Sequence, residues 1–136
     1  MIFNSTYTDP EKDLEVDKII GKKFNLIESI LLGGIGSKRL ILESYSVKFK
    51  DYIKDGFDLN YVNIELRKKG IKVFITNRQK RITWVIPYYR LVIYKTPFFS
   101  IHSNGSFLKF SNKLNHKENL SFFIKLVKIK VILNFF

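Results

Sequence analysis

The residues with the clearest chemical potential are basic side chains in the second half of the chain. Residues 1–60 hold 9 Lys and Arg against 10 Asp and Glu, whereas residues 61–136 hold 15 against 2. A one-sided basic surface attracts polyanions such as nucleic acid, anionic lipid or an acidic protein. The candidate anion-binding residues are Arg67, Lys68, Lys69, Lys72, Arg78, Lys80, Arg81 and Arg90.

Aromatic residues follow these cations closely, at Trp84, Tyr88 and Tyr89. If the hairpin turns that carry the cations gather at one end of a sheet, they form a cationic mouth. Such a mouth could hold a phosphorylated headgroup through charge-assisted hydrogen bonds, or follow a nucleic-acid backbone. The alternative is that the lysines only solubilise a surface around an aromatic core.

Catalytic patterns are weaker. The run of residues 33–38, Gly-Gly-Ile-Gly-Ser-Lys, lacks the Gly-Lys-Ser/Thr order with which a phosphate loop opens a helix, so a plain connecting loop is favoured. Strand alternation places Ser100 on the face of His102, but the sequence offers no nearby acid for a Ser-His-acid relay. We therefore assign no catalytic residue and do not expect an enzyme.

Metal and cofactor chemistry find little support. The chain has no cysteine and only two histidines, His102 and His116, which excludes disulfides, thiolate nucleophiles and cysteine-based zinc sites. Acidic residues at every second position from Asp9 to Asp17 lack the glycine and terminal glutamate of an EF-hand loop. They favour a solvated helix start, so no metal and no cofactor are predicted.

The elements that must position these residues are mostly strands after residue 60. Asp9-Pro10 predicts a helix over about Pro10–Ile20, residues 24–32 suit a strand or a buried helix segment, and residues 40–49 suit one or two strands. Asp55-Gly56 indicates a turn. A hairpin is expected from residues 64–66 and Ile71–Ile75, followed by a loop over 77–81 and two strands, 82–86 and 88–94, hinged at Pro87.

The end of the chain has the clearest local signals. Asn104-Gly105 between the apolar runs 98–102 and 107–110 is typical of a type I′ hairpin. Asn115 with Glu118 forms an N-capping pattern, and the apolar spacing that follows predicts a helix over about His116–Ile132. We expect one α+β domain over residues 1–136, mainly an antiparallel sheet with a C-terminal helix and a short N-terminal helix.

This order of elements resembles the second half of a pleckstrin-homology-like domain, including its bacterial and GRAM relatives. The residues that carry the resemblance are Ile71–Thr76, residues 82–89, Phe99–Phe110 and Asn115–Ile132, which together cover about residues 61–132. The resemblance implies a bent antiparallel barrel capped by the C-terminal helix, a fold used to bind lipid headgroups, peptides or proteins. Fold analogy alone does not select among these uses.

The preferred functional hypothesis is a non-catalytic binding module that contacts an anionic lipid surface or an acidic protein through its basic loops. The alternatives are a nucleic-acid-binding protein, and a structural or protein-interaction domain whose charge is incidental. An exposed strand edge could also pair two copies into a homodimer. No leader or spanning stretch is recognised, which predicts a cytoplasmic or peripheral membrane protein without a transmembrane segment.

Overall fold

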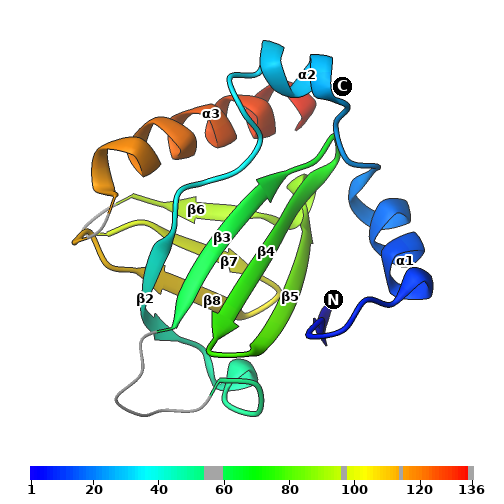
Figure 1. Cartoon of the computed structure of the whole chain (residues 1–136). Coiled ribbons are helices and arrows are strands. Elements are labelled where there is room, and N and C mark those ends of the chain that lie inside the picture. Colours follow the sequence, from blue (N-terminus) through cyan, green and yellow to red (C-terminus); the bar gives the residue numbers. More distant parts are fainter. Residues whose placement is uncertain (54–59, 96–97, 114, 135–136) are drawn as a thin grey trace.

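A computed structural model describes residues 1–53, 60–95, 98–113 and 115–134 of the chain. Figure 1 shows its elements, in which η denotes a short 3-10 helix. Their order is β1 (Ile2–Asn4), α1 (Pro10–Ile20), α2 (Leu26–Leu31), β2 (Leu40–Tyr45), η1 (Val47–Phe49), β3 (Tyr61–Leu66), β4 (Gly70–Asn77), β5 (Lys80–Pro87), η2 (Tyr88–Arg90), β6 (Val92–Tyr94), β7 (Ser100–Ser103), β8 (Ser106–Phe110) and α3 (His116–Asn134).

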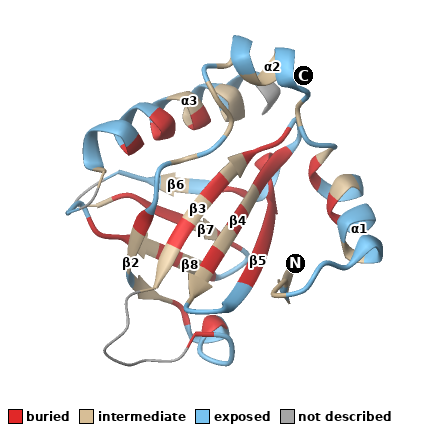
Figure 2. Cartoon of the chain, in the orientation of Figure 1, coloured by how far each residue is buried: buried red, intermediate tan, exposed pale blue. Residues whose placement is uncertain are grey.

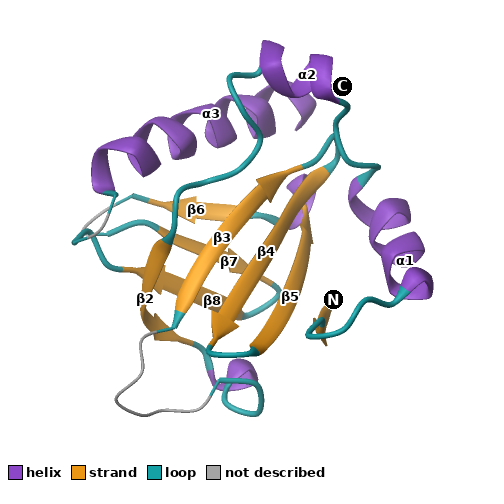
Figure 3. Ribbon diagram, viewed as in Figure 1, coloured by secondary structure: helices purple, strands orange, loops and turns teal. Residues whose placement is uncertain are grey.

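The strands form one sheet in the order β1-β5-β4-β3-β2-β8-β7-β6, and every neighbouring pair is antiparallel. β1 and β6 are its two edges among the described residues, so the sheet is open. The sheet folds over, with β3, β4 and β5 crossing in front of β6, β7 and β8, and the helices lie outside the strands (Figure 3). The expected α+β class, with an antiparallel sheet and a C-terminal helix, is confirmed.

The core lies between the two halves of the folded sheet and under α3. Ile71, Val73 and Ile75 alternate with half-buried residues along β4 and are buried, as the period of two predicted. α3 places Phe123 against Phe99, with ring centroids 4.2 Å apart. Figure 2 shows the side of α3 that faces the sheet as buried and its opposite side as exposed.

Helix α1 covers the other face of the sheet, against β4 and β5. Asp9 caps it by accepting hydrogen bonds from the backbone N–H groups of its first turn, with Pro10 at the first helical position, so this prediction is confirmed. Val16 and Ile20 of α1 pack on Val85 of β5 in a small second apolar cluster. α1 therefore creates a second protected region, separate from the main core.

The Asn-Gly hairpin is also confirmed. Asn104 and Gly105 have φ values of 51° and 78°, and they connect β7 to β8. Both central residues of a type I′ turn need a positive φ, which Asn and Gly adopt most readily. Helix α3 begins at His116 as expected, while the side-chain amide of Asn115 donates a hydrogen bond to the carbonyl oxygen of Arg39.

Two predictions in the second half need correction. Residues 77–81 are not a loop, because β4 continues to Asn77 and β5 begins at Lys80, which leaves a turn of two residues between them. Residues 88–94 are not one strand, because the backbone turns into η2 after Pro87 and only Val92–Tyr94 forms β6. Proline has no N–H to continue the ladder, and Tyr88 donates its N–H to the Lys69 carbonyl at 2.9 Å instead.

In the first half, the segment 24–32 contains the helix α2, but this helix is exposed rather than buried. Residues 40–49 contain the single strand β2 followed by η1. The turn predicted at Asp55-Gly56 lies outside the described residues. Among the described residues, no helix combines the length and the apolar character needed to cross a bilayer.

Candidate functional site

The predicted cationic mouth does not form. Gly70 pairs with Pro87 at one end of the β4–β5 ladder, and Asn77 pairs with Lys80 at the other end. An antiparallel strand of this length spans about 25 Å. The eight predicted cations therefore divide into three groups: Arg67, Lys68, Lys69 and Arg90 near the β3–β4 turn, Arg78, Lys80 and Arg81 at the β4–β5 turn, and Lys72 between them on β4.

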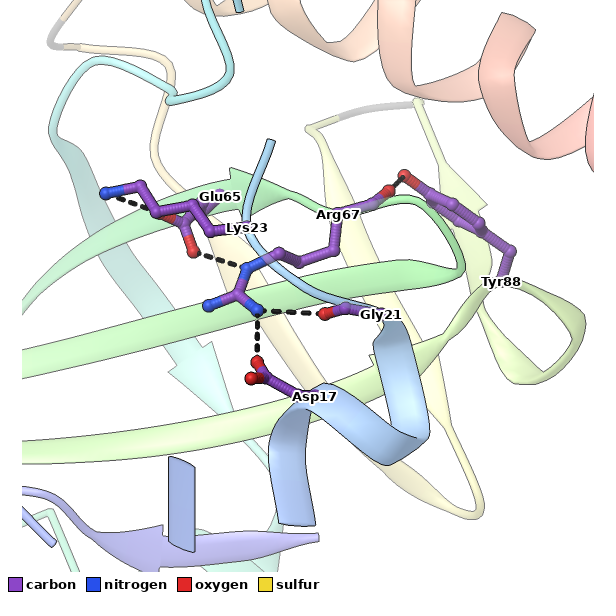
Figure 4. Close-up of polar contacts among 6 residues, drawn as sticks. All are labelled: Asp17, Gly21, Lys23, Glu65, Arg67 and Tyr88. Atoms are coloured by element: carbon purple, nitrogen blue, oxygen red, sulfur yellow. Dashed lines mark hydrogen bonds and ion pairs between the residues drawn. The ribbon is translucent and has the colours of Figure 1, made fainter. Parts of the chain in front are cut away.

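Arg67 is a buried structural cation. Its side chain donates hydrogen bonds to Glu65 Oε2 at 2.9 Å, to Asp17 Oδ1 at 3.0 Å and to the Gly21 carbonyl at 2.9 Å (Figure 4). Only 6% of the residue is exposed. These contacts attach the C-terminal end of α1 to the β3–β4 hairpin, so the guanidinium is already neutralised within the protein.

The backbone of Arg67 is held as well. Tyr88 donates its hydroxyl to the Arg67 carbonyl at 2.6 Å, and burial raises the pKa of that hydroxyl. A buried phenol with its hydrogen bond satisfied is inert at neutral pH. We therefore remove Arg67 and Tyr88 from the residues that could meet a ligand.

Lys68 and Lys69 differ from Arg67 because their side chains are exposed. Lys68 forms an ion pair with Glu28 of α2 at 3.3 Å. Glu28 and Asn25 make reciprocal hydrogen bonds that cap α2, and the bond to the Asn25 backbone, together with Lys68, lowers the pKa of the Glu28 carboxyl. Polar contacts thus fix the N-terminal end of α2 beside the β3–β4 turn.

The C-terminal end of α2 is fixed by α3. Lys125 Nζ donates to the carbonyl oxygens of Gly33 and Gly34 at 3.3 Å and 3.1 Å. The N–H groups of Gly33 and Gly34 donate to the carbonyls of Ile30 and Ser29, so they are not free to cradle a phosphate, which agrees with the interpretation of the glycine run as a connecting loop. Helix α2 lies beside the C-terminal half of α3 (Figure 1).

The apolar side chains of α2 face solvent. Leu26 is 76% exposed, Ile27 71%, Ile30 67% and Leu31 82%. Their spacing puts all four on one side of the helix. On α3, Ile124, Val131 and Ile132 are 41%, 49% and 56% exposed, and helical spacing puts them on one side of the helix. We call these seven residues the α2–α3 apolar surface.

Lysines border this surface. Lys22 precedes α2 and is exposed, and Lys128 of α3 is exposed between Ile124 and Val131. Clustered apolar exposure of this kind marks interaction sites on soluble proteins. The sequence-based candidates missed this surface, although the pairs Leu26-Ile27 and Ile30-Leu31 indicate one helical face. The sequence alone could not predict that these side chains are exposed, because an apolar helix face is normally buried.

A second candidate site is a groove between α1 and the outer face of the sheet. It has a volume of about 140 Å³. Two of the predicted cations, Lys72 and Arg81, reach it and lie over the ring of Phe74, at 5.0 Å and 3.8 Å from its centroid. The remaining lining residues are Phe3, Ser5, Tyr7, Thr8, Asp9, Lys12, Asp13 and Thr83.

The environment of Lys72 in this groove disfavours its positive charge. Partial burial lowers the pKa of its ammonium, and the charges of Arg67 and Arg81 lower it further, whereas Glu65 and Asp13 act in the opposite direction. Within the described part of the chain, no carboxylate lies within ion-pair distance of Lys72 or Arg81. The groove is also lined by Asp9, Asp13 and Lys12, so its formal charge is +1, and Lys72 and Arg81 are the cations that an anion over Phe74 would stabilise.

Ser100 and His102 share one face of β7, as strand alternation predicted, and Ser100 Oγ lies 3.0 Å from His102 Nε2. The imidazole lies between the rings of Tyr94 and Phe107, and burial lowers its pKa. No acidic side chain completes a relay among the contacts of the described residues, and those residues include no cluster of metal-ligating side chains. The ring contacts of His102 join β7 to its neighbours β6 and β8.

Comparisons with protein-family models, with curated proteins and with solved structures found no match for this chain. Function must therefore be inferred from the two candidate sites themselves. The α2–α3 apolar surface offers apolar contact next to lysines, whereas the groove offers two unpaired cations beside an aromatic ring.

Proposed function

We propose that this protein is a non-catalytic binding module that attaches peripherally to an anionic lipid surface. The observation that carries the proposal is the apolar face of α2, where Leu26, Ile27, Ile30 and Leu31 are each about two-thirds or more exposed on a helix fixed at both ends. Such a face is costly in water and gains free energy where it can leave water.

The chemistry of the α2–α3 apolar surface fits an anionic lipid bilayer better than a polar macromolecule such as nucleic acid. Burying a leucine or isoleucine side chain contributes about 1.5–3 kcal/mol, and a lysine near an anionic bilayer contributes about 1 kcal/mol. Leu26 and Leu31 would enter the interface, while Lys22 and Lys128 would meet the headgroups. Apolar insertion and electrostatic attraction would then act on the same side of the molecule.

The arrangement of strands supports a pleckstrin-homology-like architecture as part of this proposal. Strands β2–β5 form one meander and β6–β8 form a second, the pairing of β2 with β8 joins them, and α3 lies across one end of the folded sheet. This is the arrangement expected of a bent antiparallel sheet capped by a C-terminal helix. α1 and α2 would be additions to that architecture, with α2 supplying the contact with lipid.

Liposome co-sedimentation tests the proposal. The protein should pellet with vesicles of phosphatidylcholine and phosphatidylserine, and much less with phosphatidylcholine alone. The double variant Ile27→Ser and Leu31→Ser should lose at least tenfold in vesicle affinity. The matched control is Leu14→Ser with Val47→Ser, which removes apolar side chains of 63% and 75% exposure on α1 and η1 and should bind like the parent protein.

Several outcomes would overturn this function. Equal loss in both double variants would remove the special role of α2. If the parent protein binds duplex DNA and dissociates from vesicles when DNA is added, nucleic acid would be the partner. A dimer in solution that the α2 variant converts to a monomer, with no vesicle binding, would assign the surface to a second copy of the chain.

A further inference from the structure

The groove beside α1 is built around the ring of Phe74. Lys72 precedes Phe74 by two residues on β4, and Arg81 pairs with Thr76, two residues beyond Phe74. Alternation puts all of these side chains on the outer face of the sheet. The two cations therefore approach the ring from opposite directions along the strand, and both lie over it.

The floor of the groove is ordered by hydroxyl groups. Thr83 is fully buried, and its hydroxyl donates to Ser5 Oγ at 2.6 Å. Ser5 Oγ in turn donates to the Arg81 carbonyl at 3.3 Å, and Thr6 Oγ1 accepts the Arg81 N–H at 3.1 Å. These bonds join the segment after β1 to β5, so the backbone of Arg81 is fixed while its guanidinium extends over Phe74.

Two carboxylates, Asp9 and Asp13, line the groove, but within the described part of the chain neither forms an ion pair with Lys72 or Arg81. Asp9 accepts hydrogen bonds from the N–H groups of Glu11 at 3.1 Å and Lys12 at 3.4 Å. Glu65 is bonded to Arg67 and lies 3.7 Å from Lys23. Asp13 attracts Lys72 from beyond ion-pair distance.

The third cation of the groove, Lys12, is already engaged. It forms an ion pair with Glu15 at 3.7 Å, and its ammonium lies 5.7 Å from the centroid of the Phe3 ring. Lys72 and Arg81 thus remain the cations whose charge no carboxylate neutralises among the described residues. Counted with Lys12, Asp9 and Asp13, the lining holds three cations and two carboxylates, so its formal charge is +1 and favours an anion.

We infer that this groove binds a small soluble organic phosphate, held by the Lys72 ammonium and the Arg81 guanidinium above Phe74. Arginine presents a planar fork of N–H donors that suits phosphate oxygens, and lysine adds a compact charge. The groove volume of about 140 Å³ exceeds the ~10–15 Å³ that a single water needs. Phe3 and Tyr7 would contact the organic part of the ligand.

Calorimetric titration with glycerol phosphate and with inorganic phosphate tests this site, at constant ionic strength maintained with chloride. Lys72→Met and Arg81→Met should each lower the affinity at least tenfold, because each removes one charge while keeping an apolar stem. Lys80→Met is the matched control, since Lys80 adjoins Arg81 on β5 and does not line the groove. It should change the affinity less than twofold.

The parent protein and the variants should have the same circular dichroism spectrum, which shows that they fold alike. If methionine at the half-buried position 72 prevents folding, the Arg81→Met variant alone tests the site. Equal losses in the Lys80 and Arg81 variants would overturn the site, as would binding of acetate as tight as that of phosphate. Absence of any phosphate binding would do the same. The Ile27→Ser and Leu31→Ser variant should keep phosphate binding, so this site and the proposed lipid contact can fail separately.

Discussion

Arg67 and Arg81 carry the same charge at opposite ends of the β4 strand, yet their environments differ completely. Arg67 is 6% exposed and bonded to two carboxylates and a backbone carbonyl. Arg81 is exposed, and its guanidinium lies 3.8 Å from the centroid of the Phe74 ring. A cation in a basic segment is therefore available to a ligand only if no carboxylate of the fold has already neutralised it.

The largest effect is expected from replacing the two arginines by methionine. Arg67→Met leaves Asp17 and Glu65 without their shared cation and should cost about 3 kcal/mol of unfolding free energy, the low end for a broken buried pair, because their side chains are 34% and 15% exposed. Arg81→Met removes an exposed charge and should stay within about 0.5 kcal/mol of the parent. Urea denaturation monitored by tryptophan fluorescence measures the unfolding free energy of both variants. Similar losses of stability in the two variants would show that the carboxylates around Arg67 do not make it more important to the fold than Arg81.

A smaller loss is expected from Gly70→Ala at the Arg67 end of β4. A Cβ at Gly70 would clash with Ile20 of α1 and with the backbone of Ile86 and Pro87, because helix and strands approach each other closely there. Such overpacking costs about 1–3 kcal/mol. Gly36→Ala is the control, since a Cβ at Gly36 meets open space. Thermal unfolding of both variants should separate them, and a neutral Gly70→Ala would show that α1 is not tightly docked.

The smallest effect on stability is expected at His102. Its side chain is partly buried, so its surroundings affect its charge, as the surroundings of Arg67 and Arg81 affect their availability to a ligand. Burial lowers the pKa of His102, so the unfolded chain binds a proton more readily than the folded protein. The contribution of His102 is present above the unfolded pKa of about 6.5 and is lost as pH falls below it. His102→Asn should weaken the fall in stability below about pH 6.5. An unchanged pH profile would contradict this origin.

Much of the fold could be predicted because its signals are local. Asp9-Pro10 at the start of α1, Asn104-Gly105 between β7 and β8, and the alternation along β4 each depend on residues a few positions apart. The single cationic mouth was wrong for a reason that strand geometry could have supplied. Successive hairpin turns of an antiparallel meander lie at opposite ends of the strand they share.

By itself, the sequence determined the class of the elements, the basic second half and the residue types that could meet an anion. Only the tertiary structure decided which cations are neutralised, since Arg67 meets Asp17 across 50 positions of the chain. It also exposed the apolar face of α2 and brought Lys72 and Arg81 to one ring. The physical reason is that ion pairing and burial depend on distances between segments far apart in sequence, which local propensity and period do not contain.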